Sequence, residues 1–455
     1  MAGKRKNSFA FCGGAFGDEG KGRVVDKFVE DFSQSKAVVV YRDNGGANAG
    51  HTLELKNGHR IALHQLPSGV FAKKATVVLG KGMVLHPGDL KSEIEEVETV
   101  LGAKIKAKIL IDEMAALSLD THRAFEAVLK TWHDGGKGAT GRGIAPAYAD
   151  ILLRHPLRMR DLLVFDKKKI EDHYLLYEAL IAGLGQKLET VLVPTLAGEK
   201  IVVGTKKEFV TRLEKQKEKL IPYISEVYQF LQKSWRDEKY AFVFEKAQGV
   251  GLDWRYGVYP DVTASDTTLR AIFPSTEGII DPQEIEVRAG VIKATYMSTV
   301  GTRKLPTMME EELASRIRED AQEYGATTRR PRGIAYLDLA ALKFFSQAGF
   351  FNCLVLTHMD IVYPNAPIKI CTGYELNGKE VSYRPDQEFL NQLTPKYIEL
   401  PSWDKQALGK AKKRQDLPSQ AKDFLDFISQ EMNLPILMIT SGPKREQGIL
   451  FKKKC

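Results

Sequence analysis

Short apolar runs recur along the chain, and stretches with apolar residues at helical spacing, such as residues 24–30, lie between them. The clearest runs cover residues 9–12, 37–41, 76–79, 108–111, 241–244, 353–356 and 436–439. Most of them lead into a polar or glycine-rich loop. This alternation predicts an α/β fold with a large mixed, mostly parallel β-sheet flanked by helices. Because ligands on such sheets bind beyond the carboxyl ends of the strands, we expect the functional groups in the loops that follow the runs.

Residues 161–240 have a different pattern. They are rich in Lys, Glu and Leu and predict helices, interrupted by a short segment near residues 191–203. No low-complexity linker or convincing internal repeat divides the chain. We therefore expect a single domain over residues 1–455 with a helical insertion at about 161–240.

The composition is that of a globular protein. The chain has 455 residues, of which 43% are hydrophobic and 27% charged, so a sizeable core can form. No apolar run approaches the ~18 residues of a membrane span, and the basic start of the chain is not followed by a signal-peptide pattern. The four cysteines form no C-x-x-C pair, so we expect neither a zinc site nor a disulfide framework, and a cytoplasmic location.

The formal net charge is +8, and much of the excess lies in short Lys/Arg clusters. These clusters lack the interleaved aromatic residues of single-strand binders, so they are more typical of solvated surface than of a nucleic-acid site. The charge therefore predicts no nucleic-acid partner, and nothing in the sequence predicts a membrane partner.

The segment Gly13–Arg23, GGAFGDEGKGR, lies between the first apolar run and a helical pattern. Glycines let a backbone approach a phosphate, and a helix N-terminus offers it free N–H groups. The segment is not a Walker A loop, because Lys21 is followed by Gly22 and the hydroxyl that would bind Mg²⁺ is missing. It carries the acid pair Asp18-Glu19 instead, and an acid beside phosphates holds a metal or moves a proton. We interpret it as a nucleotide loop with its own base or metal ligand, with a tight turn of solvated charges as the alternative.

Two further segments have phosphate-binding features. Residues 44–52 are rich in Gly and Ala and leave Asn48 and His51 as the useful polar groups, and His51 can donate a proton or bind a phosphate oxygen. Residues 138–143 pair glycines with the hydroxyl of Thr140, and Arg154 follows. The second signal is weak alone, because an arginine near such a loop is often a surface ion pair.

Later segments offer groups for a base and for carboxylates. Gln248 and Thr263 can supply neutral hydrogen bonds. Residues 325–332 place two hydroxyls beside three guanidinium groups, which suits a dicarboxylate, although a phosphate, a nucleic-acid backbone or a solvated turn also fits. Asp360 follows an apolar run and can accept from N1–H and N2–H of guanine, a donor pair that adenine lacks. Ser441-Gly442, after the last run, can complete a base pocket, or either segment can be an ordinary turn.

Taken together, these segments resemble the adenylosuccinate synthetase family from about Phe9 to Gly448. The resemblance rests on GDEGKG at 17–22, NAGHT at 48–52, TGRGIAPAY at 140–148, AQG at 247–249, YPDVT at 259–263, GATTRRPR at 325–332, THMD at 357–360 and TSGP at 440–443. It implies a nucleotide site similar to that of the phosphate-loop GTPases. It also implies a ligase that joins IMP and L-aspartate through 6-phosphoryl-IMP, with GTP as co-substrate and Mg²⁺ as cofactor. The product would be adenylosuccinate, in the first committed step of AMP synthesis, and the expected assembly is a homodimer.

The resemblance also implies a role for each matching residue. Asp18 would be the general base and, with the Gly50 carbonyl, a Mg²⁺ ligand; Lys21 would neutralise the transferring phosphoryl group, and His51 would be the catalytic acid. The implied IMP contacts are Asn48, Thr140, Gln248, Thr263 and an Arg154 that reaches the site of the partner subunit. The implied aspartate contacts are Thr328, Arg330 and Arg332. The implied GTP contacts are Gly20, Lys21, Gly22, His51, Thr52, His358, Asp360, Ser441 and Gly442.

Several positions depart from the family pattern. His358 stands where the family usually has lysine, and Arg329 where it has glycine. Residues 300–307 read VGTRKLPT instead of VGxGPFPT, which adds Arg303 and Lys304, and Asp266 replaces an asparagine. The same chemistry on another 6-oxopurine nucleotide such as (d)GMP, or with another amine donor, is therefore the alternative. A GTP-dependent switch without ligation is a third hypothesis, which product formation would exclude.

Overall fold

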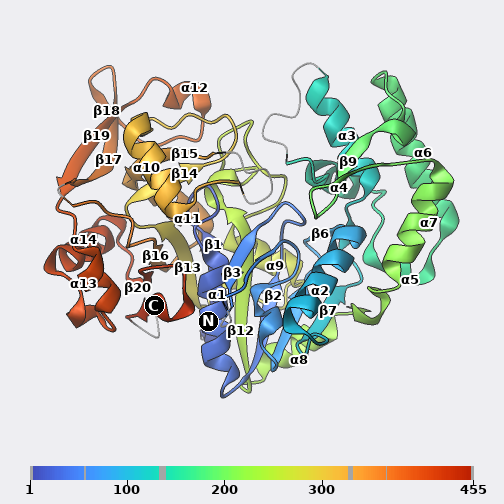
Figure 1. The fold of residues 1–455 in the computed structure, drawn as a ribbon, viewed down its shortest axis with the longest axis horizontal. Coiled ribbons are helices and arrows are strands. Elements are labelled where there is room, and N and C mark those ends of the chain that lie inside the picture. Colours follow the sequence, from blue (N-terminus) through green and yellow to red (C-terminus); the bar gives the residue numbers. More distant parts are fainter. Residues whose placement is uncertain (1–3, 56–57, 133–139, 326–330, 365, 452–455) are drawn as a thin grey trace.

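The fold was obtained as a computed structural model, which describes the chain except residues 1–3, 56–57, 133–139, 326–330, 365 and 452–455 (Figure 1). Its centre is a ten-stranded sheet in the order β11-β7-β5-β2-β12-β1-β13-β16-β20-β21. In that order the strands are Ile224–Ser225, Lys108–Asp112, Ala75–Leu79, Ala37–Arg42, Tyr240–Gly249, Arg5–Gly13, Ile285–Lys293, Cys353–Thr357, Ile436–Thr440 and Gly448–Leu450. All neighbouring pairs are parallel except β20 and β21. The predicted α/β fold is confirmed, and each predicted apolar run lies in this sheet.

Both faces of the sheet are buried. Along β1, Phe9 and Phe11 belong to the hydrophobic core on one face, whereas Ala10 and Cys12 belong to the core on the other. This is why the runs are continuously apolar instead of alternating. The pattern did not reveal β13, beside β1 at the centre of the sheet, because charged residues such as Glu286 interrupt its first half.

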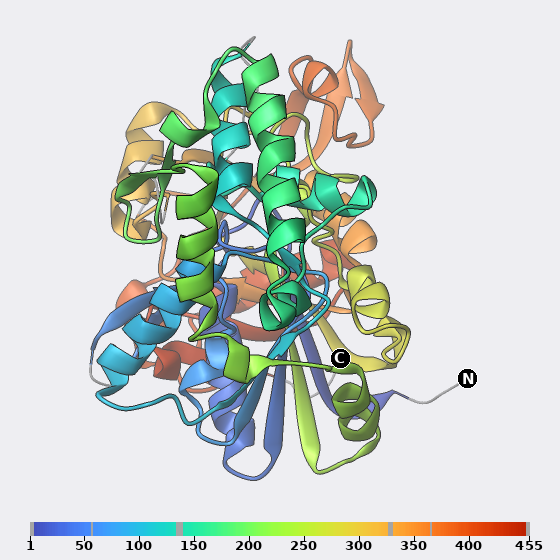
Figure 2. The same cartoon turned by 90° about the vertical axis from the view of Figure 1, so that its right-hand side faces the viewer.

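Helices cover the sheet and extend the molecule on one side. They are α1 Lys21–Ser33, α2 Pro87–Leu101, α3 Asp120–Thr131, α4 Ile144–Leu152, α5 Met159–Val164, α6 Lys167–Gly183, α7 Lys206–Lys217, α8 Tyr228–Arg236, α9 Ile272–Ser275, α10 Glu311–Ala321, α11 Leu339–Gly349, α12 Gln387–Leu390, α13 Lys405–Lys410 and α14 Ser419–Met432. In Figure 1, α3, α6 and α7 stand to the right of the central sheet, and Figure 2 shows them from the side. No helix among the described residues is long and apolar enough to cross a membrane.

Residues 161–240 contain most of α5, all of α6, α7 and α8, and the hairpin of β9 (Leu192–Pro194) and β10 (Lys200–Val202). The hairpin lies in the interruption expected near residues 191–203. Within the same segment β11 pairs with β7, so the chain is already back at the edge of the central sheet before residue 240.

A second sheet lies on the opposite side of the molecule, at the left of Figure 1. Its strands are β14 Tyr296–Thr299, β15 Gly333–Asp338, β17 Ile368–Leu376, β18 Lys379–Val381 and β19 Thr394–Leu400. Two small pairs complete the strands: β3 (His51–Glu54) with β4 (Arg60–Leu63), and β6 (Val84–Leu85) with β8 (Ala116–Leu117).

The carboxyl ends of β2, β12, β1, β13, β16 and β20 meet along one edge of the central sheet, because these strands are parallel neighbours. The glycine-rich loop, the 44–52 segment, Gln248, the 357–360 segment and Ser441 all occur at those ends. The sheet therefore gathers segments that are far apart in the sequence, as expected for such folds.

Candidate active site

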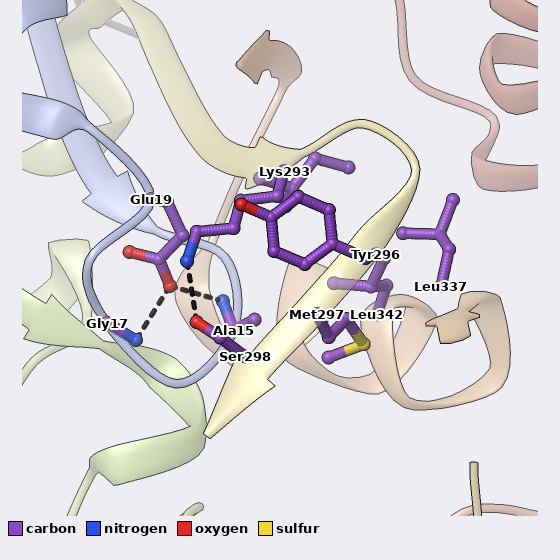
Figure 3. A pocket seen from close by; sticks show the side chains of 10 residues that line it. Ala15, Gly17, Glu19, Lys293, Tyr296, Met297, Ser298, Leu337 and Leu342 are labelled. Atoms are coloured by element: carbon purple, nitrogen blue, oxygen red, sulfur yellow. Dashed lines mark hydrogen bonds between the residues drawn. The ribbon is translucent and has the colours of Figure 1, made fainter. Parts of the chain in front are cut away.

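The glycine-rich loop after β1 wraps around a buried carboxylate. Glu19 Oε1 accepts hydrogen bonds from the backbone N–H of Gly17 at 2.8 Å and of Ala15 at 3.2 Å (Figure 3). Lys21 Nζ donates to Glu19 Oε2 at 2.8 Å. The two acids therefore have different environments: the Glu19 side chain is buried inside the loop, whereas the Asp18 side chain is 32% exposed. In this structure Glu19 occupies the N–H donors of the loop and the Lys21 ammonium, which are the kinds of group that a phosphate site uses.

Helix α1 begins at Lys21, after Gly20, whose φ of 81° favours glycine. At Gly22 a Cβ would lie 2.9 Å from the Cβ of His51, so this glycine allows the helix to pack directly against His51. The loop and the 44–52 segment therefore come together. His51 and Thr52 start β3, with His51 buried and Thr52 exposed, and Gly50 precedes them.

His51 has a carboxylate partner that the sequence analysis missed. Glu245, fully buried in β12, contacts His51 Nδ1 and accepts hydrogen bonds from the backbone N–H of Ser68 at 2.7 Å and its hydroxyl at 2.5 Å. Burial lowers the pKa of His51, although the charge of Glu245 opposes this. The contact fixes the ring and directs Nε2 away from Glu245. A charged residue directly after the apolar run 241–244 was the available signal.

Asp18 lies beside an arginine of the second sheet. Arg332, just before β15, contacts Asp18 Oδ2 through Nη2 and donates through Nη1 to Glu323 Oε2 at 3.2 Å. A predicted aspartate-binding residue and the predicted general base are therefore in direct contact. The other predicted aspartate contacts, Thr328 and Arg330, lie outside the described residues.

The residues predicted for the base pocket lie at the ends of β16 and β20. The N–H of Met359 donates to the Thr440 carbonyl at 3.0 Å, which brings His358 and Asp360 close to Ser441 and Gly442. Arg23 of α1 contacts the Gly442 carbonyl and the Thr440 hydroxyl and was not predicted.

His358 is an uncharged member of this pocket. Its ring lies edge-on to Tyr296, with the ring centres 6.0 Å apart. Burial, together with the charges of Lys293 and Arg23, lowers the pKa of His358 to about 3. Histidine here does not replace the charge of the family's lysine.

The predicted IMP contacts divide into two groups. Asn48 and Gln248 lie near each other, because a Cβ at Gly45 would be 3.2 Å from Gln248 Oε1 and Asn48 Oδ1 accepts from Gly46 at 3.2 Å. Both polar atoms of Gln248 and the Thr263 hydroxyl are buried without a hydrogen-bond partner among the described residues. Buried polar groups without a hydrogen-bond partner suit a polar ligand. Thr140 and Arg154 are exposed on the segments before and after α4, and Arg154 has a φ of 67°.

Two of the additional charged residues, Arg303 and Asp266, are bound to other groups of the protein. Arg303 is buried, contacts the Asp261 carbonyl, donates to Thr299 Oγ1 at 2.8 Å, and lies 4.4 Å over the ring of Phe16. Asp266 pairs with Arg255 at 2.7 Å. Lys304 is exposed, and Arg329 lies outside the described residues.

Two sets of groups have the chemistry of cation ligands. Asp18 and the Gly50 carbonyl offer oxygen ligands of the type that Mg²⁺ prefers. In the helical region, His122, Asp150 and His173 also cluster. Both nitrogens of His122 are already used, however: Nδ1 accepts from the Leu119 N–H at 2.8 Å, and Nε2 donates to Asp150 at 2.9 Å. That cluster is therefore a hydrogen-bonded core.

The comparisons with known proteins agree on one family. The adenylosuccinate synthetase family model matches residues 10–449. An adenylosuccinate synthetase of Bdellovibrio bacteriovorus is 33% identical over 449 residues, which cover 97% of each chain. The solved structure of fully ligated adenylosuccinate synthetase from Plasmodium falciparum superposes with a TM-score of 0.84 at 28% identity, covering 98% of this chain and 100% of that one. Succinoaminodeoxyadenylate synthetase (PurZ) of cyanophage S-2L, solved with dGMP and dATP, has a TM-score of 0.55 at 18% identity, covering 98% and 95%, which is a likeness of fold alone.

Proposed function

The chain belongs to the adenylosuccinate synthetase family, and from that premise we propose how its own residues carry out the reaction. The activity is the ligation of IMP and L-aspartate, which forms a C–N bond in AMP synthesis, with GTP as co-substrate.

In the first step, Asp18 removes the N1 proton of IMP, and O6 then attacks the γ-phosphate of GTP. The P–O bond to GDP breaks as the bond to O6 forms, giving 6-phosphoryl-IMP. Support comes from the loop itself: Glu19 is enclosed by it, whereas Asp18 is the acid that faces outward. Lys21 and the loop N–H groups neutralise charge on the phosphoryl group.

His51 is the acid in this proposal. Negative charge from the bound phosphates favours its imidazolium form, which Glu245 balances from the opposite side. Nε2–H is then directed away from Glu245 and donates to the departing phosphate oxygen.

In the second step, the amine of L-aspartate attacks C6. The new C–N bond forms, the C6–O bond breaks, phosphate leaves with the electron pair, and the amine loses a proton. Thr328, Arg330 and Arg332 hold the substrate's carboxylates, for which arginine forks are suited.

For the nucleotides, we propose that Asp360 reads N1–H and N2–H of guanine with His358, Ser441 and Gly442 around the base. Gly20, Lys21, Gly22, His51 and Thr52 contact the phosphates. Asp18 and the Gly50 carbonyl would hold Mg²⁺, which would supply charge neutralisation at the phosphates.

IMP is held by Asn48, Thr140, Gln248 and Thr263, and by Arg154 of the partner subunit in a homodimer. Two exposed apolar residues directly before Arg154 support an interface there, since Leu152 is 83% and Leu153 65% exposed. We further propose that residues 1–455 act as one domain, with its helical insertion at about 161–240, in the cytoplasm.

The contact between Asp18 and Arg332 beside the glycine loop is the observation that carries this proposal. Asp18→Asn keeps the size of the side chain but cannot accept the N1 proton. We expect it to lower adenylosuccinate formation at least about 10³-fold, with GTP binding retained. Asp31→Asn on the exposed face of α1 is the matched control and should keep wild-type activity. Near-normal turnover in Asp18→Asn would exclude Asp18 as the base.

A further inference from the structure

Arg332 lies between two carboxylates in different environments. Nη1 donates to Glu323, whose side chain is 3% exposed, and Nη2 contacts Asp18, whose side chain is 32% exposed. The first partner is sealed inside the protein. The second is partly exposed to solvent.

Glu323 is itself held in place from the side opposite Arg332. Lys293 Nζ contacts Glu323 Oε1, and the hydroxyl of Tyr296 donates to the same oxygen at 2.6 Å. Lys293 also donates to Ser298 Oγ at 2.5 Å, which Figure 3 shows beside the glycine-rich loop. Burial alone would raise the pKa of Glu323, but Lys293 and Arg332 lower it to about 2. The two cations therefore favour the charged form of Glu323.

One nitrogen of Arg332 remains unused. Nε is buried and has no hydrogen-bond partner among the described residues. Nε and Nη2 form the edge of a guanidinium group that binds a carboxylate with two parallel hydrogen bonds. Asp18 uses Nη2 alone, so a carboxylate placed across this edge would make one more bond than Asp18 does.

We propose that Glu323, held by Lys293 and Tyr296, is a positioning residue. It orients Arg332 so that the Nε–Nη2 edge of the guanidinium group binds a carboxylate of L-aspartate. This carboxylate replaces Asp18 as the partner of Nη2. The inference rests on the proposed function, in which Asp18 is the base and Arg332 binds aspartate. Its consequence is coupling: binding of a dicarboxylate frees Asp18 to accept the N1 proton of IMP.

The test uses the first step alone. GTP labelled with ¹⁸O in the β–γ bridge is incubated with the full-length protein, IMP and Mg²⁺, and migration of the label to non-bridging positions reports reversible phosphoryl transfer. Succinate has two carboxylates but no amine, so it can occupy Arg332 without forming product. We expect succinate to accelerate label migration about tenfold in the wild type. Glu323→Gln should abolish this acceleration at the same succinate concentration.

Steady-state kinetics provide the second measurement. Glu323→Gln should raise the KM for aspartate about 10–100-fold and leave the KM values for IMP and GTP within about twofold. Tyr296→Phe removes one hydrogen bond and keeps the charges, so its KM for aspartate should rise only about threefold. Glu319→Gln, an exposed glutamate on α10 that contacts Tyr324, is the matched control and should match the wild type.

Two results would overturn the inference: wild-type label migration that succinate leaves unchanged, or a Glu323→Gln variant whose three KM values rise together. Both presuppose that the wild type makes adenylosuccinate. A wild type that makes none contradicts the proposed function instead, so the two failures are distinguishable.

Discussion

The carboxylate of Glu245 contacts Nδ1 of His51, and both side chains are buried beneath the loops at the carboxyl edge of the sheet. The negative charge of Glu245 stabilises the imidazolium form that the proposed acid requires.

The first prediction concerns this pair. Glu245→Gln keeps the shape of the side chain but removes the charge, so the imidazolium form becomes less favourable. We expect kcat to fall about 10²–10⁴-fold with KM values little changed, as for other carboxylates that orient a catalytic histidine. Steady-state rates measure this, with the exposed Glu238→Gln as control. An unchanged kcat would mean that Glu245 has a structural role only.

The second prediction tests the proposed homodimer. If Arg154 completes the site of the partner subunit, Arg154→Leu and Asp18→Asn are each inactive alone. In a mixed dimer, one of the two sites has both residues intact. Equal mixtures should therefore regain about a quarter of the wild-type activity by random assortment of subunits. Activity that stays at the level of the separate variants would show that Arg154 does not act across an interface.

The third prediction concerns the choice of nucleotide. Asp360→Asn replaces an acceptor of two hydrogen bonds with a side chain that accepts one and donates the other, which mismatches guanine. We expect the KM for GTP to rise about 10–100-fold and kcat to stay within a few-fold. The ratio of kcat/KM for GTP to that for ATP should fall accordingly. If both nucleotides are affected equally, Asp360 contributes to the pocket without reading the base.

The fourth prediction is a dependence of stability on pH. Burial is the main cause that lowers the pKa of His173 to about 3, and this residue is 5% exposed. In the unfolded chain His173 binds a proton near pH 6.5, whereas in the folded chain it stays neutral down to about pH 3. The contribution of neutral His173 to the free energy of unfolding is therefore fully present above pH 6.5 and is lost as the pH falls towards 3. The contribution of His173 to the free energy of unfolding should decrease by about 1 kcal/mol between pH 6.5 and 5.5.

His173→Asn tests this contribution. Its free energy of unfolding, measured with urea, should fall less between pH 6.5 and 5.5 than that of the wild type. The exposed His59→Asn serves as the control and should follow the wild-type pH dependence. Parallel pH curves for all three proteins would show that His173 titrates normally.

The sequence predicted the parts of the fold that have strong local patterns. Continuous apolar runs such as 37–41 identified strands buried on both faces, and the loops after them held the expected polar groups. Strand β13 was not predicted, because charged residues interrupt the apolar pattern in its first half. No local pattern shows that β13 lies beside β1. Strand order is set by packing between distant segments, which hydrophobic periodicity does not encode.

The candidate site was predictable where chemistry depends on short motifs. Asp18, Lys21 and His51 stand in glycine-rich loops, and they come together at one edge of the sheet. Two partners of site residues were missed, because each is an isolated acid outside any motif: Glu245 contacts His51 across the fold, and Glu323 contacts Arg332, nine residues further along the chain. From the sequence, Arg303 was expected to be a cation near the substrates. Its contacts with Asp261 and Phe16 could not be predicted, because they too join segments that are distant in the sequence.

The most direct measurement is product identity. Purified protein is mixed with GTP, Mg²⁺, L-aspartate and an equimolar pair of IMP and dGMP, and the products are resolved by mass. We expect adenylosuccinate with one GDP and one phosphate per molecule formed. Formation of the aspartate adduct of dGMP in preference to adenylosuccinate, or GTP hydrolysis without either adduct, would contradict it.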